Sequence, residues 1–103
     1  MTEADLMRQI MVELSADGHF VARANVGLFF TKDGRPVRSG LPKGFSDVFG
    51  HRACDARAFY LEVKTATGRA SPEQLAFIAA MQKRGALAAI VRSVEDAKRA
   101  LAG

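Results

Sequence analysis

The stretch Ala58-Phe59-Tyr60-Leu61-Glu62-Val63-Lys64 is an apolar run that carries an acid and a base near its end. It predicts a strand, and successive side chains of a strand point to opposite faces of a sheet. Glu62 and Lys64 therefore share one face, while Val63 lies on the other. Charged side chains on so apolar a strand are costly to bury unless they are paired or bound to a ligand. The run thus predicts both a strand and a candidate site.

Asp47 precedes Glu62 by fifteen residues and follows Gly44-Phe45-Ser46. Two carboxylates and a lysine at this spacing suit a magnesium-dependent site for phosphodiester hydrolysis, because carboxylates hold a hard cation and an ammonium assists at the water or phosphate. Each feature has a structural alternative: a turn-forming aspartate at Asp47, and a cross-strand ion pair at Glu62 and Lys64. Their conjunction with a helix that begins at an inward-facing glutamine, Gln74, favours the site.

Two polar residues begin helices on the apolar side. Glu3 lies on the same helical stripe as Leu6, Met7 and Ile10, which predicts that it points toward the edge of the core. The alternative is that Glu3 is an acid of the first turn that interacts favourably with the helix dipole. Gln74 stands in the same relation to the apolar residues of its own helix. It also completes Ser71-x-x-Gln74, a capping box, and the two roles are compatible.

The whole chain, residues 1–103, is predicted to be one mixed α/β domain. Helices are expected over residues 3–17, 72–84 and 94–102, after the N-caps Thr2, Ser71 and Ser93, with Gly18 and Gly85 as stops. Strands are expected over residues 20–24, 47–50, 58–64 and 87–91. Residues 27–30 are a possible continuation of the first strand, a turn follows at residues 33–34, and a strand from Val37 is left open. The predicted order is α-β-β-β-α-β-α.

Composition restricts the functional classes. The net charge is +4 and the pI about 9.7, which permits a polyanionic partner without requiring one. Cys54 is the only cysteine, so no internal disulfide can form, and a reducing compartment, the cytoplasm, is expected. No signal peptide or apolar run of membrane-spanning length is visible, so no membrane partner is expected. His19 and His51 are isolated, and no cluster of histidine and cysteine suggests zinc.

The motifs resemble those of the VRR-NUC domain, a branch of the PD-(D/E)xK nuclease superfamily often found in phages and prophages. The matching segments span nearly the whole chain in the family's order: Thr2-Glu3-Ala4, Arg23 to Gly27, Lys43 to Val48, Phe59 to Thr65, and Gly68-Arg69-x-Ser71-x-x-Gln74. Ser46 stands where the superfamily's motif has proline. The resemblance implies a restriction-endonuclease-like fold, with a central mixed sheet flanked by helices.

The resemblance also implies roles for the site residues. Asp47, Glu62 and the Val63 carbonyl would bind Mg²⁺ or Mn²⁺, with no organic cofactor, and Glu3 would hold metal directly, through water or at a second position. Lys64 would orient or deprotonate the attacking water, or stabilise the charge on the phosphate. Gln74 would position Lys64 or a phosphate.

DNA is the expected substrate. The basic loops around the site are predicted to contact phosphates of the DNA. Phe29-Phe30 is assigned to the core in preference to a dimer surface or a wedge against DNA. The candidate DNA-binding residues are Arg23, Lys32, Arg35, Arg38, Lys43 and Arg69.

Similarity to stand-alone relatives that resemble Holliday-junction resolvases implies a homodimer, with an interface near residues 28–38 or on the first helix. It further implies an endonuclease selective for branched DNA such as four-way junctions, in a bacterial host cell. Three alternatives stay open: a preference for flaps, nicks or ends, a catalytically silent DNA-binding module, and an α/β domain whose Glu62–Lys64 pair is purely structural.

Overall fold

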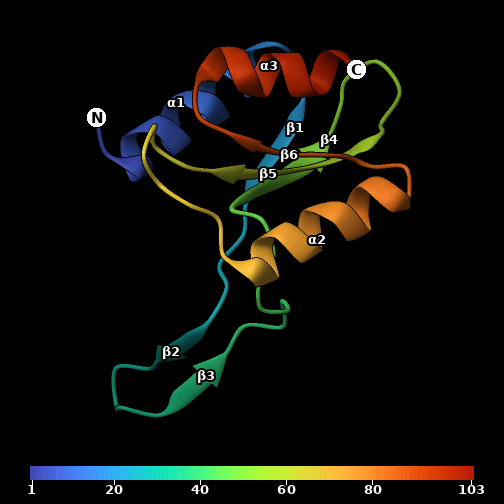
Figure 1. The fold of residues 1–103 in the computed structure, drawn as a ribbon. Coiled ribbons are helices and arrows are strands. Elements are labelled where there is room, and N and C mark those ends of the chain that lie inside the picture. The colour runs from blue at the N-terminus through green and yellow to red at the C-terminus, as the bar shows by residue number, and fades with distance from the viewer.

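The computed structural model describes all residues, 1–103, and contains three helices and six strands (Figure 1). In chain order these are α1 (Glu3–Ala16), β1 (Phe20–Arg23), β2 (Leu28–Phe30), β3 (Pro36–Arg38), β4 (Val48–His51), β5 (Ala58–Val63), α2 (Pro72–Lys83), β6 (Leu87–Val91) and α3 (Val94–Ala102). None of the helices is both long and apolar enough to cross a membrane.

The central sheet has four strands in the order β1-β4-β5-β6. β1, β4 and β5 pair antiparallel, whereas β6 lies parallel to β5 after the crossover through α2. Around this sheet the elements follow the predicted order α-β-β-β-α-β-α, and the mixed α/β fold is confirmed. Strands β2 and β3 are an addition between β1 and β4, where they form a separate two-stranded antiparallel sheet. Residues 27–30 therefore do not continue β1.

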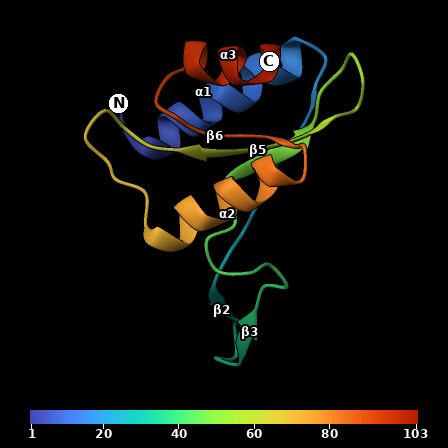
Figure 2. The same ribbon diagram turned by 45° about the vertical axis from the view of Figure 1, so that its right-hand side comes forward.

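Helices α1 and α3 cover one face of the central sheet and α2 covers the other (Figures 1 and 2). The side chains of Phe59, Leu61 and Val63 on β5 belong to the main hydrophobic core beneath α1 and α3. The strand alternation then turns Tyr60 and Glu62 toward α2. On that side Tyr60 packs edge-on against Phe77 of α2, with ring centroids 5.5 Å apart.

The helix starts follow the expected capping chemistry. The side chains of Thr2, Ser71 and Ser93 accept hydrogen bonds from backbone N–H groups in the first turns of α1, α2 and α3. Ser71 and Gln74 form the predicted capping box, and Pro72 occupies the first turn of α2. Local sequence therefore fixes where α2 begins, which matters because its first turn lies at the site.

The β2–β3 hairpin projects away from the rest of the fold, on the α2 side of the sheet (Figures 1 and 2). All six of its strand residues are exposed, including Phe29 and Phe30. The assignment of this phenylalanine pair to the core was therefore wrong. The physical reason is that no helix or second sheet packs over the hairpin, so an apolar local sequence has no layer to bury itself against.

Candidate active site

The side chains of Asp47, Glu62, Lys64 and Gln74 converge where three elements meet. Asp47 is the residue before β4, Glu62 lies near the end of β5, and Gln74 lies in the first turn of α2. Lys64 directly follows β5, and its backbone N–H donates to the Val91 carbonyl of β6. The antiparallel register pairs Val48 with Leu61, which brings the start of β4 beside the end of β5. Four residues separated along the chain are thereby brought together.

Glu62 is the centre of the cluster and has 1% of its surface exposed. Its Oε1 accepts a hydrogen bond of 2.7 Å from Gln74 Nε2 and lies 3.6 Å from Lys64 Nζ. Its Oε2 is buried and has no hydrogen-bond partner. Since a buried acceptor without a partner costs free energy, this oxygen is a position where a ligand would be stabilising.

Electrostatics at Glu62 point the same way. Burial raises the pKa of the Glu62 carboxyl to about 8, and the neighbouring Asp47 carboxylate adds to the rise while the Lys64 ammonium opposes it. A buried carboxylate next to a second acid is disfavoured in its charged form unless a cation joins it, as the raised pKa of Glu62 indicates. The cluster is therefore short of positive charge, and the Lys64 ammonium does not fully supply it.

Asp47 is held in place by backbone contacts. Its Oδ2 accepts a 2.9 Å hydrogen bond from the Val63 N–H, and its own carbonyl accepts one of 2.9 Å from the Ala24 N–H. The N–H and C=O of one strand residue point to the same side of the strand, so the Val63 carbonyl also points toward Asp47. The Val63 carbonyl and Asp47 therefore lie on the β4 side of β5, and the Glu62 side chain lies on its α2 face.

Ser46, which stands where the motif that the sequence resembles has proline, is bonded to the start of β4. It is fully buried, and its hydroxyl donates a 3.1 Å hydrogen bond to the Val48 carbonyl. This bond ties the residue before Asp47 to the start of β4. The departure from proline therefore leaves Asp47 anchored.

Gln74 has both of the roles that the sequence allowed. Its Oε1 accepts from the Ser71 N–H at 2.8 Å to complete the capping box, while its Nε2 donates to Glu62. Gln74 is linked to Lys64 through the Glu62 Oε1 that both contact, at 2.7 and 3.6 Å. Gly44 packs against this same helix start: a Cβ there would lie 2.5 Å from the Glu73 carbonyl oxygen, and its φ is +88°.

These donors fit a hard divalent cation. The set comprises two carboxylates, one of which has a buried free oxygen, and one backbone carbonyl on the Asp47 side of β5. Mg²⁺ takes oxygen ligands and usually keeps several waters, so it does not require a third protein carboxylate. Nitrogen and sulfur ligands, which zinc prefers, are absent from the cluster.

Neither Glu3 nor Arg69 forms a hydrogen bond or ion pair with the converging residues. Glu3 is exposed in the first turn of α1, and no group of three or more acids, histidines or cysteines is arranged to hold a metal. Arg69 is exposed in the loop before α2 and does not line the cavity described next. The structure thus gathers Asp47, Glu62, Val63, Lys64 and Gln74.

A cavity of about 420 Å³ opens beside the cluster. Asp47 and Gln74 line it from one side, and Arg23 and Lys43 bring positive charge to its rim. Phe29, at the base of the hairpin, also lines it. Lys32, Arg35 and Arg38 lie farther out, exposed on the hairpin and its turn. The expected basic residues are therefore split between the cavity and the projecting arm.

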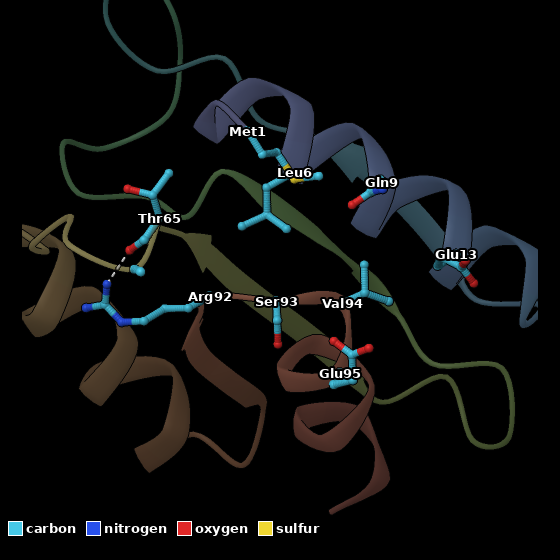
Figure 3. Close-up of a pocket in the computed structure, with 10 residues that line it drawn as sticks. Met1, Leu6, Gln9, Glu13, Thr65, Arg92, Ser93, Val94 and Glu95 are labelled. Carbon is cyan, nitrogen blue, oxygen red and sulfur yellow. Dashed lines mark hydrogen bonds between the residues drawn. The ribbon is translucent and has the colours of Figure 1, made fainter.

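A second hollow, of about 470 Å³, lies between α1 and the start of α3 (Figure 3). Arg92 extends from it, and its Nη1 donates to the carbonyls of Thr65 at 2.5 Å and Gly68 at 2.7 Å. These bonds hold the turn that directly follows Lys64. Sequence reasoning missed this contribution of Arg92, because nothing local to residue 92 signals a contact with a turn 24 residues away.

Comparison with known proteins identifies a family and a fold. The model of the VRR-NUC domain family matches residues 20–95, a range that contains Asp47, Glu62, Lys64 and Gln74. A solved structure described as a VRR_NUC domain superposes with a TM-score of 0.66 at 20% sequence identity, covering 94% of this chain and 90% of that one. No curated protein matches the sequence.

At 20% identity the structural likeness shows the fold alone. The family model matches most of the chain and therefore shows the family. A nuclease-type domain implies DNA as the substrate. The chain belongs to the VRR-NUC domain family.

Proposed function

We propose that the protein is a divalent-metal-dependent DNA endonuclease of the PD-(D/E)xK type, which hydrolyses phosphodiester bonds. The observation that supports this most is the buried Glu62 carboxylate, with its Oε2 unpartnered beside Asp47 and its Oε1 shared by Gln74 and Lys64. After the Gln74 and Lys64 contacts are made, Oε2 is still available to a cation.

The oxygen atoms of Asp47, Glu62 and Val63 would hold Mg²⁺ or Mn²⁺. Such an ion, when bound, supplies Lewis-acid activation of the phosphate and a more acidic bound water. The chain's contribution is to fix the ligands beforehand: the Val63 N–H fixes Asp47, and Gln74 fixes Glu62. Glu3, exposed in the first turn of α1, would hold metal directly, through water or at a second position.

Lys64 supplies the remaining charge. Its side chain is 14% exposed and its ammonium lies 3.6 Å from Glu62 Oε1, so it is held in the cluster yet open on one side. From there it either accepts a proton from the attacking water or stabilises the negative charge that develops on the phosphate. Gln74 acts indirectly, by orienting the carboxylate that holds Lys64.

The basic residues would bind the DNA backbone. Arg23 and Lys43 at the cavity suit phosphates next to the scissile bond, and Lys32, Arg35 and Arg38 suit phosphates farther along, with Arg69 near the start of α2. Contacts of this kind position DNA without reading its sequence. Binding should weaken steeply as salt concentration rises.

Branched DNA such as a four-way junction, cut by a homodimer, is the proposed substrate and assembly. Two sites related by a two-fold axis match the symmetry of a junction. Two apolar surfaces are available for pairing: Val12 on α1, which is 68% exposed, and Phe30 on the hairpin, which is 66% exposed. Light scattering on Val12→Glu and Phe30→Glu identifies the interface, and a monomeric wild type at micromolar concentration would refute the dimer.

The deciding experiment is cleavage of a labelled panel of four-way junction, flap, nicked duplex, duplex and single strand in Mg²⁺, Mn²⁺ or EDTA. Wild type is compared with Asp47→Ala and with Glu95→Ala, which removes an exposed acid on α3. We expect metal-dependent cutting of a branched substrate that Asp47→Ala abolishes and Glu95→Ala retains. DNA binding without cutting in any metal would instead identify a silent DNA-binding module.

A further inference from the structure

The β2–β3 hairpin exposes four large apolar side chains to solvent. Leu28 and Phe29 are each 46% exposed, Phe30 is 66% exposed and Val37 is 49% exposed. A two-stranded hairpin is marginally stable by itself, and clustered exposed apolar side chains commonly mark an interaction surface. The hairpin therefore has the character of a binding arm.

Register divides the arm into two faces. Phe29 pairs with Val37, and cross-strand partners place their side chains on the same face. Leu28 pairs with Arg38 and Phe30 with Pro36, so these four lie on the opposite face. Phe29 also lines the cavity that contains Asp47 and Gln74. The Phe29–Val37 face is thus continuous with the candidate active site.

The charge of the molecule is concentrated on the same part of the chain. Residues 20–46 contain five of the fifteen basic residues and one of the eleven acids, so they carry the entire net charge of +4. The remaining residues hold ten basic and ten acidic side chains. The one acid, Asp33, is already engaged by the Arg35 guanidinium at 3.1 Å. Lys43 is paired with Glu73 of α2 at 3.5 Å, and Arg23, Lys32 and Arg38 form no ion pair. An apolar face accompanied by three unpaired cations suits a polyanion with flat, apolar parts.

A nucleic acid meets that description better than a second copy of this chain. Two copies of the arm would bring like charges together, whereas phosphates would neutralise them. Aromatic side chains stack on bases whatever the sequence, provided that the base is not already stacked in a duplex. The face next to the cavity would then contact bases close to the phosphate that is cut.

We propose that the Phe29–Val37 face of the β2–β3 hairpin binds unstacked bases at the point where a DNA duplex opens. This inference rests on the proposed function only for the position of the scissile phosphate, beside Asp47. It would make the arm the element that distinguishes branched or forked DNA from continuous duplex, while its cations grip the flanking backbone.

Binding without cleavage tests the arm directly. Anisotropy in EDTA measures the affinity for a forked duplex with unpaired arms and for a fully paired duplex of equal length. Phe29→Ala should weaken fork binding about tenfold and duplex binding little, and Phe29→Tyr should restore the affinity. Phe20→Ala is the matched control, since Phe20 is 53% exposed at the far end of β1 and stacks on His51. A 2-aminopurine beside the fork reports unstacking.

Three outcomes would overturn the proposal. Equal losses on fork and duplex would mean that the arm grips backbone alone, and an unchanged fork affinity would mean that Phe29 contacts no base. Dissociation of a dimer by Phe29→Ala, seen by light scattering, would make a second copy the occupant. Because no step requires cleavage, the arm can be confirmed even if the cleavage panel shows no nuclease activity.

Discussion

The end of β5 and the β2–β3 hairpin depart from the usual burial of side chains in opposite directions. β5 buries the Glu62 carboxylate, with 1% of its surface exposed, whereas the hairpin leaves Phe30 66% exposed to solvent. Charged groups are seldom fully buried and large aromatic groups usually are, so neither placement is explained by folding alone.

The two regions meet at one cavity, which Asp47 lines from the sheet and Phe29 from the hairpin. Local violations of the burial rule tend to occur at functional sites, where a ligand compensates for them. A cation would compensate the carboxylates, and an apolar, polyanionic partner would cover the arm. We therefore regard the carboxylate cluster and the hairpin as two parts of one binding region. The cluster would carry out the reaction, and the hairpin would bind the DNA.

The largest expected effect comes from removing the charge beside Glu62. Lys64→Ala should lower the single-turnover rate of DNA cleavage by about 10²- to 10⁴-fold, the usual loss when a positioned acid–base group is deleted. Lys83→Ala, which removes a lysine from the last turn of α2, is the control and should retain the rate. Cleavage by Lys64→Ala at the wild-type rate would exclude a chemical role for this lysine.

Glu62→Gln should separate stability from metal binding. The amide cannot ionise and so avoids the cost of placing a charge at this buried position, and the metal-free protein should gain about 1–3 kcal/mol. Wild type should melt at a higher temperature in Mg²⁺ than in EDTA, because a ligand of the native state stabilises it. The variant should lose that difference. An equal Mg²⁺-induced rise in both proteins would place the metal elsewhere.

The stability of the metal-free protein should depend on pH through the same group. The pKa of Glu62 is raised from its ordinary value near 4.5 to about 8, so the native state binds this proton more tightly than the unfolded chain. The contribution is complete below pH 4.5 and is lost as pH rises toward and through 8. Urea unfolding in EDTA should show this decline in wild type and a flatter profile in Glu62→Gln.

The site was largely predictable because its signals are local. Strand alternation in residues 58–64 placed Glu62 and Lys64 together opposite Val63, and the structure has Val63 in the core and Glu62 3.6 Å from Lys64. The Ser71-x-x-Gln74 spacing gave the helix start. The direct bond from Gln74 to Glu62 was not predicted, since it depends on how closely α2 approaches β5.

The predictions that failed or were missed depend on which other elements pack against a strand or helix. The apolar pair Phe29-Phe30 has the composition of a core strand, and no local pattern indicates that no layer covers it. Arg92 acts on a distant turn. In each case the deciding contact, present or absent, is made between elements rather than within one.

The smallest expected effect tests the other half of the comparison. Phe30→Ser should change the free energy of unfolding by no more than about 0.5 kcal/mol, as exposed positions usually do. Phe59 lies on β5, which is also an apolar strand, and it is fully buried beneath α1 and α3. Phe59→Ala should therefore lower the free energy of unfolding by about 3–5 kcal/mol. Urea denaturation at micromolar and at tenfold higher concentration measures both. If Phe30→Ser destabilised the protein by several kcal/mol, and more so at the higher concentration, the Phe30 face of the hairpin would be a contact between two copies of the chain.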